Sequence, residues 1–173
     1  MQALRQFSIP IKGLKTGLHE FKFEIDQEFF KSFENSPVKS GLLNCALAFD
    51  KKDDHILLNF ETQGSVVTTC DRCTSQINLP LSSDYEIIVK YGEGNNEMEE
   101  VYYLDPDAHE INVASLIYEQ IVLALPMIKV YDCEVDDPRP CNVEILSILS
   151  EESEQASNPL GDALKNLKID KND

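Results

Sequence analysis

Hydrophobic and polar positions alternate along most of the first hundred residues. In residues 21–25, for example, apolar side chains at positions 21, 23 and 25 alternate with a lysine and a glutamate. A period of two with aromatic and β-branched residues predicts strands that bury one face. Residues 42–49 and 56–60 flank a polar turn and predict a hairpin. We therefore expect residues 5–104 to form a mostly antiparallel sheet or an open barrel.

Helical spacing interrupts this alternation twice. A short helix is predicted where Asp26, a good N-cap, precedes three phenylalanines at helical spacing. A longer helix is predicted near residues 112–125, between Asn112 as N-cap and Pro126 as stop. Its apolar face is wide, as expected of a helix that covers a sheet and belongs to the core. The fold class predicted is therefore α+β.

The composition changes after residue 131. Residues 132–154 hold eight acids and a single base, and residues 150–158 are polar and rich in serine and glutamate. Such a composition is typical of a solvated linker. Three regions are therefore expected: a strand-rich α+β domain over residues 1–131, an acidic segment and linker over 132–157, and a short amphipathic helix over 158–168.

The chain carries a strong negative charge that is concentrated in one stretch. The formal net charge of the 173 residues is -16, and residues 92–154 contain 16 acids but only 2 bases. A surface this acidic repels a polyanion, so strong unaided binding of nucleic acid is disfavoured. The same charge would attract a basic protein. A purely solubilising role for the acids is the alternative at this point.

The N-terminal residues have no long apolar region of the kind that forms a signal peptide. The longest apolar runs, residues 45–49 and 121–125, are far too short to span a bilayer. We expect a cytoplasmic protein without membrane contact. In that compartment a Cys-x-x-Cys pair is typical of metal binding or redox chemistry rather than of a structural disulfide.

Four of the five cysteines form a candidate zinc site. Two residues separate Cys70 from Cys73, a spacing that lets both thiolates bind one tetrahedral ion. Cys133 and Cys141 would supply the other ligands, although seven residues separate them. Two other readings stay open: a redox-active pair, which the strand-like flanks disfavour, and reduced cysteines without metal. Cys45 lies in a predicted strand and is interpreted as a buried apolar residue.

No catalytic or cofactor-binding residues are predicted. The sequence has no glycine-rich phosphate loop and no nucleophile motif, and no small-molecule substrate is evident. The histidines His19, His55 and His109 are scattered and are interpreted as surface residues. A zinc ion held by four thiolates is coordinatively closed, whereas catalytic zinc keeps an open position. These features favour a binding protein over an enzyme.

The order of four segments resembles the YceD family. They are residues 11–21 (Ile-Lys-Gly-Leu-Lys-Thr-Gly-Leu-His-Glu-Phe), the Cys-Asp-Arg-Cys of residues 70–73, the Leu-Ile-Tyr-Glu-Gln-Ile-Val-Leu-Ala-Leu-Pro of residues 116–126, and the Asn-Pro-Leu-Gly-Asp-Ala-Leu-Lys-Asn-Leu of residues 158–167. The resemblance implies a large-subunit ribosomal RNA accumulation protein, linked to 23S rRNA synthesis or processing and without an established catalytic activity. Many members have a pair of histidines or cysteines after the helix, which Cys133 and Cys141 match. Leu160 stands where the family has arginine, which weakens an RNA-contacting role there.

These observations predict a non-enzymatic factor in assembly of the large ribosomal subunit. It would act through a basic ribosomal protein or an assembly intermediate that contains 23S rRNA, with Leu160, Leu164 and Leu167 in contact with the partner. The alternatives are a zinc-dependent enzyme, for instance a nuclease, and a redox-sensing Cys-x-x-Cys module.

Overall fold

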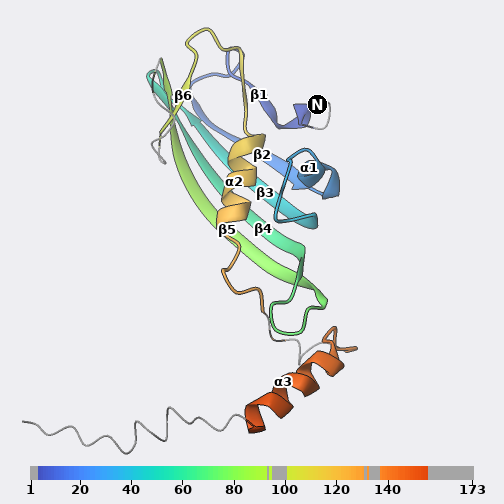
Figure 1. The fold of residues 1–173 in the computed structure, drawn as a ribbon. Helices are drawn as coiled ribbons and strands as arrows, with labels where there is room; N and C mark the ends of the chain where they lie inside the picture. Colours follow the sequence, from blue (N-terminus) through green and yellow to red (C-terminus); the bar gives the residue numbers. More distant parts are fainter. Residues whose placement is uncertain (1–3, 93, 95–100, 131, 133–136, 156–173) are drawn as a thin grey trace, which may run out of the picture.

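A computed structural model describes residues 4–92, 94, 101–130, 132 and 137–155 of the chain (Figure 1). Two predicted features lie outside the described residues: the amphipathic helix of residues 158–168 and the candidate ligand Cys133. Everything stated below about the structure refers to the described residues.

The main element is a five-stranded sheet in the order β2-β3-β4-β5-β6. Its strands are β2 (Gly17–Ile25), β3 (Ser40–Lys51), β4 (His55–Thr69), β5 (Gln76–Tyr91) and β6 (Val101–Leu104). All neighbours are antiparallel except β5 and β6, which are parallel. A separate antiparallel pair joins β1 (Ser8–Pro10) to β7 (Glu110–Asn112). The predicted α+β class is confirmed, and the sheet is open rather than closed into a barrel.

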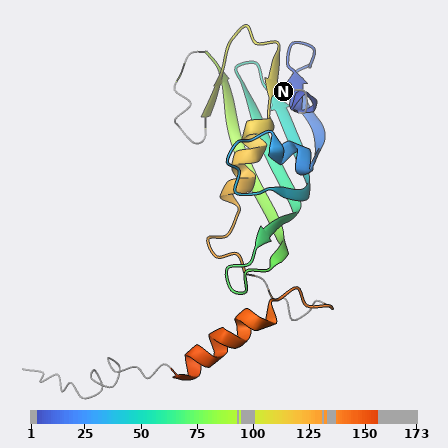
Figure 2. The same ribbon diagram turned by 45° about the vertical axis from the view of Figure 1, so that its right-hand side comes forward.

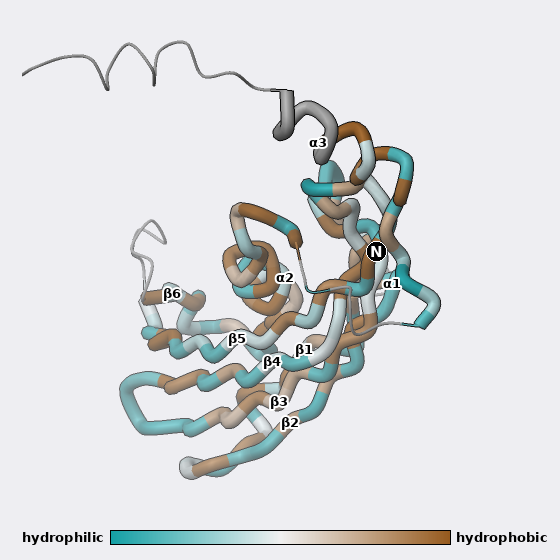
Figure 3. Tube along the Cα trace, turned by 90° about the horizontal axis from the view of Figure 1, so that it is seen from below, coloured by the Kyte–Doolittle hydropathy of each residue, from teal (hydrophilic) through white to brown (hydrophobic). Residues whose placement is uncertain are grey.

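Four helical segments complete the fold. They are η1 (Arg5–Phe7), α1 (Gln27–Lys31), α2 (Ala114–Leu123) and α3 (Val143–Gln155). Figures 1 and 2 show α1 and α2 on the same side of the curved sheet, whereas α3 lies beyond the turn that joins β4 to β5. The view in Figure 3 looks up from below and shows α2 lying over one face of the sheet.

The period-two pattern explains which sheet face becomes the core. Cys45 pairs with Thr62 and Phe49 pairs with Leu58, so these side chains share one face, and all four are buried. The buried residues of α2 pack on this face, among them Leu116, Ile117 and Ile121. The helix predicted over residues 112–125 is therefore confirmed as the cover of the sheet. Cys45 is buried as expected, and its burial raises the pKa of the thiol.

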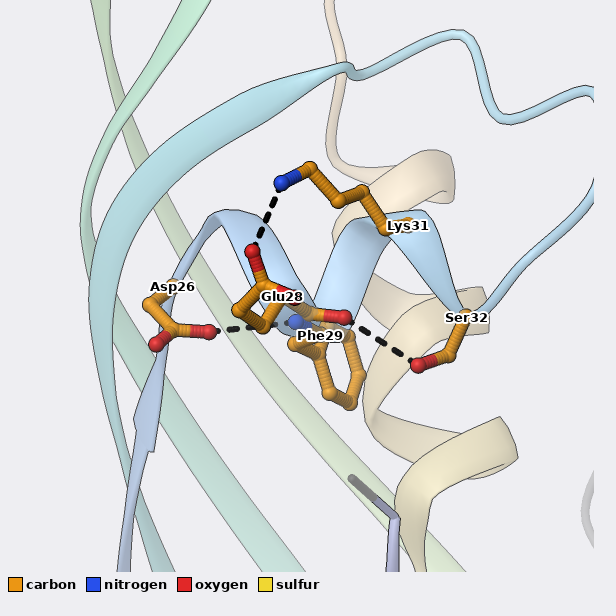
Figure 4. A network of polar contacts seen from close by, with 5 residues as sticks. All are labelled: Asp26, Glu28, Phe29, Lys31 and Ser32. Carbon is orange, nitrogen blue, oxygen red and sulfur yellow. Dashed lines mark hydrogen bonds and ion pairs between the residues drawn. The ribbon is translucent and has the colours of Figure 1, made fainter. Parts of the chain in front are cut away.

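Local capping explains where α1 begins. The side chain of Asp26 accepts a hydrogen bond of 3.1 Å from the backbone N–H of Phe29 (Figure 4). This bond satisfies one of the N–H groups that the first turn of a helix leaves unpaired. Phe29 and Phe30 are then buried, and Phe29 lies against Phe7 with 4.9 Å between the ring centroids. The cap therefore holds an aromatic cluster against the edge of the core.

The structure differs from the sequence-based expectation in residues 132–157. Residues 143–155, predicted as part of an acidic linker, form the helix α3. The side chain of Asn142 accepts hydrogen bonds from the backbone N–H groups of Glu144 and Ile145, at 3.1 and 3.4 Å, and so caps the helix. Leu146 packs against the core cluster. The apolar residues of the first half of α3 recur with a helical period, but the acidic composition of residues 132–157 favours the prediction of a linker.

Candidate functional site at the cysteine knuckle

Cys70 and Cys73 lie in the tight turn between β4 and β5, which we call the cysteine knuckle (residues 70–75). The backbone N–H of Cys70 donates to the carbonyl of Ser75 at 2.8 Å, and that of Thr74 donates to the carbonyl of Cys70 at 2.9 Å. Thr74 has a φ of 58°, a left-handed conformation that lets the chain reverse here. Both cysteines are free and buried. The turn therefore brings two reduced thiols together at the end of the hairpin.

The surroundings of Cys73 favour its thiolate. Backbone hydrogen bonds from Ser75 and then Asn142, together with the neighbouring Cys70 thiol, lower the pKa of Cys73 from 9.0 to about 7. Donors aimed at a sulfur stabilise its charged form, and the thiolate is the form that binds metals and acts as a nucleophile. The knuckle is thus prepared for metal binding or for thiol chemistry.

The segment that follows α2 is fastened to the same knuckle. Asp71 accepts a hydrogen bond of 2.7 Å from the backbone N–H of Lys129, and the N–H of Asp71 donates to the carbonyl of Lys129 at 3.0 Å. The ammonium of Lys129 also lies 3.8 Å from the Asp71 carboxylate. These contacts join residues far apart in the sequence and fix the path of the chain beyond α2.

The predicted ligands come together in part. The backbone of Asn142 contacts Cys73. Asn142 directly follows Cys141, so the Cys141 segment reaches the knuckle. Cys141 itself is disulfide-bonded, and Cys133 lies outside the described residues. Among the described residues, no group of three or more potential metal ligands is present. The four-cysteine zinc site therefore stays a prediction, as does the role of Leu160, Leu164 and Leu167, which lie beyond the described residues.

The histidines have ordinary surface environments. The ring nitrogen Nε2 of His19 donates a hydrogen bond of 2.8 Å to the carbonyl of Lys15, and His55 pairs with Asp54 at 2.7 Å. His109 is exposed. None of the three lies in a group of metal ligands within the described part of the chain.

Sequence analysis missed a strip of exposed apolar residues beside the knuckle. We call it the apolar strip, and it consists of Leu123, Met127, Ile128 and Val130. Leu123 belongs to the apolar pattern that predicts the helix over residues 112–125, but it is the last residue of α2 and its side chain is 79% exposed. The signal that could have revealed the strip is the pair of apolar residues directly after Pro126, where no helix can bury them.

Exposed acids are present in the segments that form or adjoin the knuckle and the apolar strip. Their side chains come from the knuckle, from α2, from the segment after it and from the first turn of α3: Asp71, Glu119, Asp132, Asp137 and Glu144. The same segments also carry three bases: Arg72 and Arg139 are exposed, and Lys129 is half-buried and pairs with Asp71. The region therefore combines apolar side chains with an excess of acids over bases.

Comparison with known proteins identifies one match. A family model described as "Large ribosomal RNA subunit accumulation protein YceD" matches residues 58–168, which is more than half of the chain. The matched part runs from β4 through the knuckle, α2, the apolar strip and α3. No curated protein and no solved structure matches the chain. No helix in the described residues is long and apolar enough to cross a membrane.

Proposed function

The chain belongs to the YceD family, and we propose that it is a non-enzymatic factor that recruits a basic protein to the assembling large ribosomal subunit. Family membership implies a role in accumulation of the large-subunit rRNA and is the observation that carries the proposal. The mode of action, through a protein partner, is argued from charge.

The charge distribution supports a basic protein as the direct partner. Residues 92–154 carry 16 of the chain's acids and 2 of its bases. An RNA backbone would be repelled by this stretch, because binding of nucleic acid depends on neutralising phosphates with basic residues. Ribosomal proteins that coat RNA are basic and would be attracted to it. Contact with 23S rRNA would then be made mainly through the recruited protein, in the cytoplasm where subunits are assembled.

We further propose that Cys70, Cys73, Cys133 and Cys141 hold a structural zinc ion. The paired free thiols of the knuckle and the lowered pKa of Cys73 support this assignment. So does the hydrogen bond from Asn142, which brings the Cys141 segment to the knuckle. Ligation requires Cys141 in its reduced form. A zinc ion here would tie α3 to the hairpin of β4 and β5.

A redox-sensing function is the second candidate, because a thiol with a pKa of about 7 is partly ionised at neutral pH. The Cys-x-x-Cys pair itself lies between two strands. The backbone N–H that reaches Cys73 nevertheless belongs to Asn142, the cap of α3, and a helix N-terminus is a site that lowers the pKa of a thiol. A zinc-dependent nuclease is disfavoured because a site of four thiolates leaves no open position for water.

The proposal is tested by removing the gene and measuring the ratio of 23S to 16S rRNA in total RNA. We expect the ratio to fall, and to recover when the wild-type chain is supplied from a plasmid. In a sucrose gradient the protein should sediment with precursors of the large subunit. An unchanged ratio, together with protein that stays at the top of the gradient, would exclude the proposed function.

A further inference from the structure

Most exposed apolar side chains among the described residues lie in one stretch of the chain. Nine large apolar residues are exposed among those described, and only Leu18 and Leu42 lie outside residues 123–149. The other seven comprise the apolar strip and three residues of α3: Val143, Ile148 and Leu149. Single exposed apolar residues are ordinary, but a cluster of this kind marks an interaction surface.

The strip is exposed although its backbone is held in place. Met127 is fully exposed and Ile128 is 71% exposed, yet the next residue, Lys129, is fastened to Asp71 through both of its backbone groups. On the other side of the knuckle, the backbone of Asn142 contacts Cys73 and begins α3. The strip and α3 are thus both attached to the knuckle, and α3 lies beyond the end of the sheet (Figure 1).

We propose that the apolar strip and the exposed apolar residues of α3 form a docking surface for a basic amphipathic segment of a protein partner. This inference rests on the proposed function and names the surface through which the partner is held. Such a segment would place its apolar side chains on the strip and its lysines or arginines among the surrounding acids.

Charge decides between the possible occupants. A second copy of this chain carries a net charge of -16 and would be repelled. The chain's own residues 156–173 contain three acids and three bases, so they offer no electrostatic complement to this surface. RNA is a polyanion and is disfavoured for the same reason as in the whole chain. A basic amphipathic protein segment would cover the apolar residues and pair its charges with the acids.

The full chain is tested against a fluorescein-labelled synthetic amphipathic helix of lysine and leucine, with binding followed by fluorescence anisotropy. The variant M127S/I128S should bind the peptide about tenfold or more weakly, because two apolar side chains no longer lose water on binding. The matched control L18S/L42S removes two leucines of similar exposure from the outer face of the sheet and should bind as the wild type does. Since all four residues are exposed, both variants should keep the wild-type melting temperature.

Four results would overturn the inference. The first is equal binding by M127S/I128S and wild type. The second is equal binding of a peptide in which serine replaces every leucine, which would show that charge alone acts. The third is tighter peptide binding by the full-length variant L160S/L164S/L167S, which would show that the chain's own tail occupies the surface. The fourth is a wild-type dimer in sedimentation that M127S/I128S dissociates.

Sedimentation with large-subunit precursors separates this inference from the proposed function. If the wild type sediments with precursors and M127S/I128S does not, both stand. If both proteins sediment with precursors, the docking surface is wrong while the proposed function stands. If the wild type fails to associate, the proposed function itself fails.

Discussion

The side-chain amide of Gln120 in α2 donates a hydrogen bond of 3.1 Å to the hydroxyl of Thr62 in β4. Both residues are buried, and the hydroxyl of Ser83 reaches the carbonyl oxygen of the same amide at 3.4 Å. The rest of the interface between helix and sheet is largely apolar. Because a buried amide without partners costs about 1–3 kcal/mol, this contact fixes the position of α2 on the sheet.

Replacing Thr62 with valine should therefore destabilise the protein by about 1–3 kcal/mol. The shape is kept, but the amide N–H group of Gln120 loses its oxygen acceptor and keeps only the contact of 3.9 Å with the sulfur of Cys45. Urea denaturation gives the free energy of unfolding. The double variant T62V/Q120L should recover part of the loss, because no unpaired amide then remains. If T62V unfolds at the wild-type urea concentration, the hydrogen bond does not stabilise the fold.

The cap of α1 gives a second prediction. Asp26→Ala should lower the free energy of unfolding by about 1 kcal/mol, because the N–H of Phe29 loses its acceptor. Glu28→Gln is the matched control in the same turn: it removes an exposed ion pair with Lys31 (Figure 4), worth at most about 0.5 kcal/mol. Equal effects of the two substitutions in urea denaturation would contradict the capping role.

Much of the fold follows from local patterns in the sequence. The alternation in residues 21–25 and 42–49 predicts β2 and β3, and the cap at Asp26 predicts α1, because each depends on neighbours in the chain. The parallel pairing of β5 with β6 is different, since it depends on contacts between distant residues that no local period encodes. The partner of Gln120 is hidden for the same reason: an amide within a helix does not reveal which strand will face it.

The thiol of Cys73 should titrate near neutral pH. Its pKa is lowered to about 7 by the backbone N–H groups of Ser75 and Asn142, whereas burial raises the pKa of Cys45. With metal removed and cysteines reduced, the absorbance of thiolate at 240 nm should rise around pH 7 in the wild type. This step should be absent from Cys73→Ser. A first thiolate that forms only above pH 9 in the wild type would contradict the assignment.

The same shift has a consequence for stability. The folded pKa of about 7 lies below the unfolded value of 9.0, so the unfolded chain binds more protons between these values. The contribution of this thiolate is complete above about pH 9 and is lost as the pH falls through 7. The stability difference between wild type and Cys73→Ser should therefore grow from pH 6 to pH 9 in urea denaturation.

Protein purified without a chelator should contain about one zinc ion per chain if the four cysteines form a structural site. Cys73→Ser should lose most of this metal, whereas Cys45→Ser should keep it, because Cys45 lies buried beneath α2 and apart from the knuckle. Plasma emission spectrometry measures the content. Little zinc in the wild type, with thiols that alkylate rapidly, would remove the metal assignment and leave the family assignment intact.

The candidate site shows the same division between local and distant information. The spacing of Cys70 and Cys73 predicts a knuckle, because a two-residue gap fixes the local turn. The lowered pKa of Cys73 depends on Asn142, which is distant in sequence, and so could not be predicted from the motif. The exposure of Met127 likewise becomes visible only when the end of α2 is known.

Association with large-subunit precursor particles should depend on salt and on the tail leucines in different ways. The acids of residues 92–154 act at long range, so added salt should slow association steeply, because the screening length falls to about 8 Å at 0.15 M ionic strength. Leu164 and Leu167 would act only after contact. The variant L164S/L167S should therefore dissociate faster while its association rate keeps the wild-type salt dependence.

Surface plasmon resonance with immobilised particles measures both rates, and L18S/L42S serves as the matched control for loss of two exposed leucines. Rates that respond neither to salt nor to the tail leucines would mean that the acids only keep the protein in solution and that the tail makes no contact with the particle.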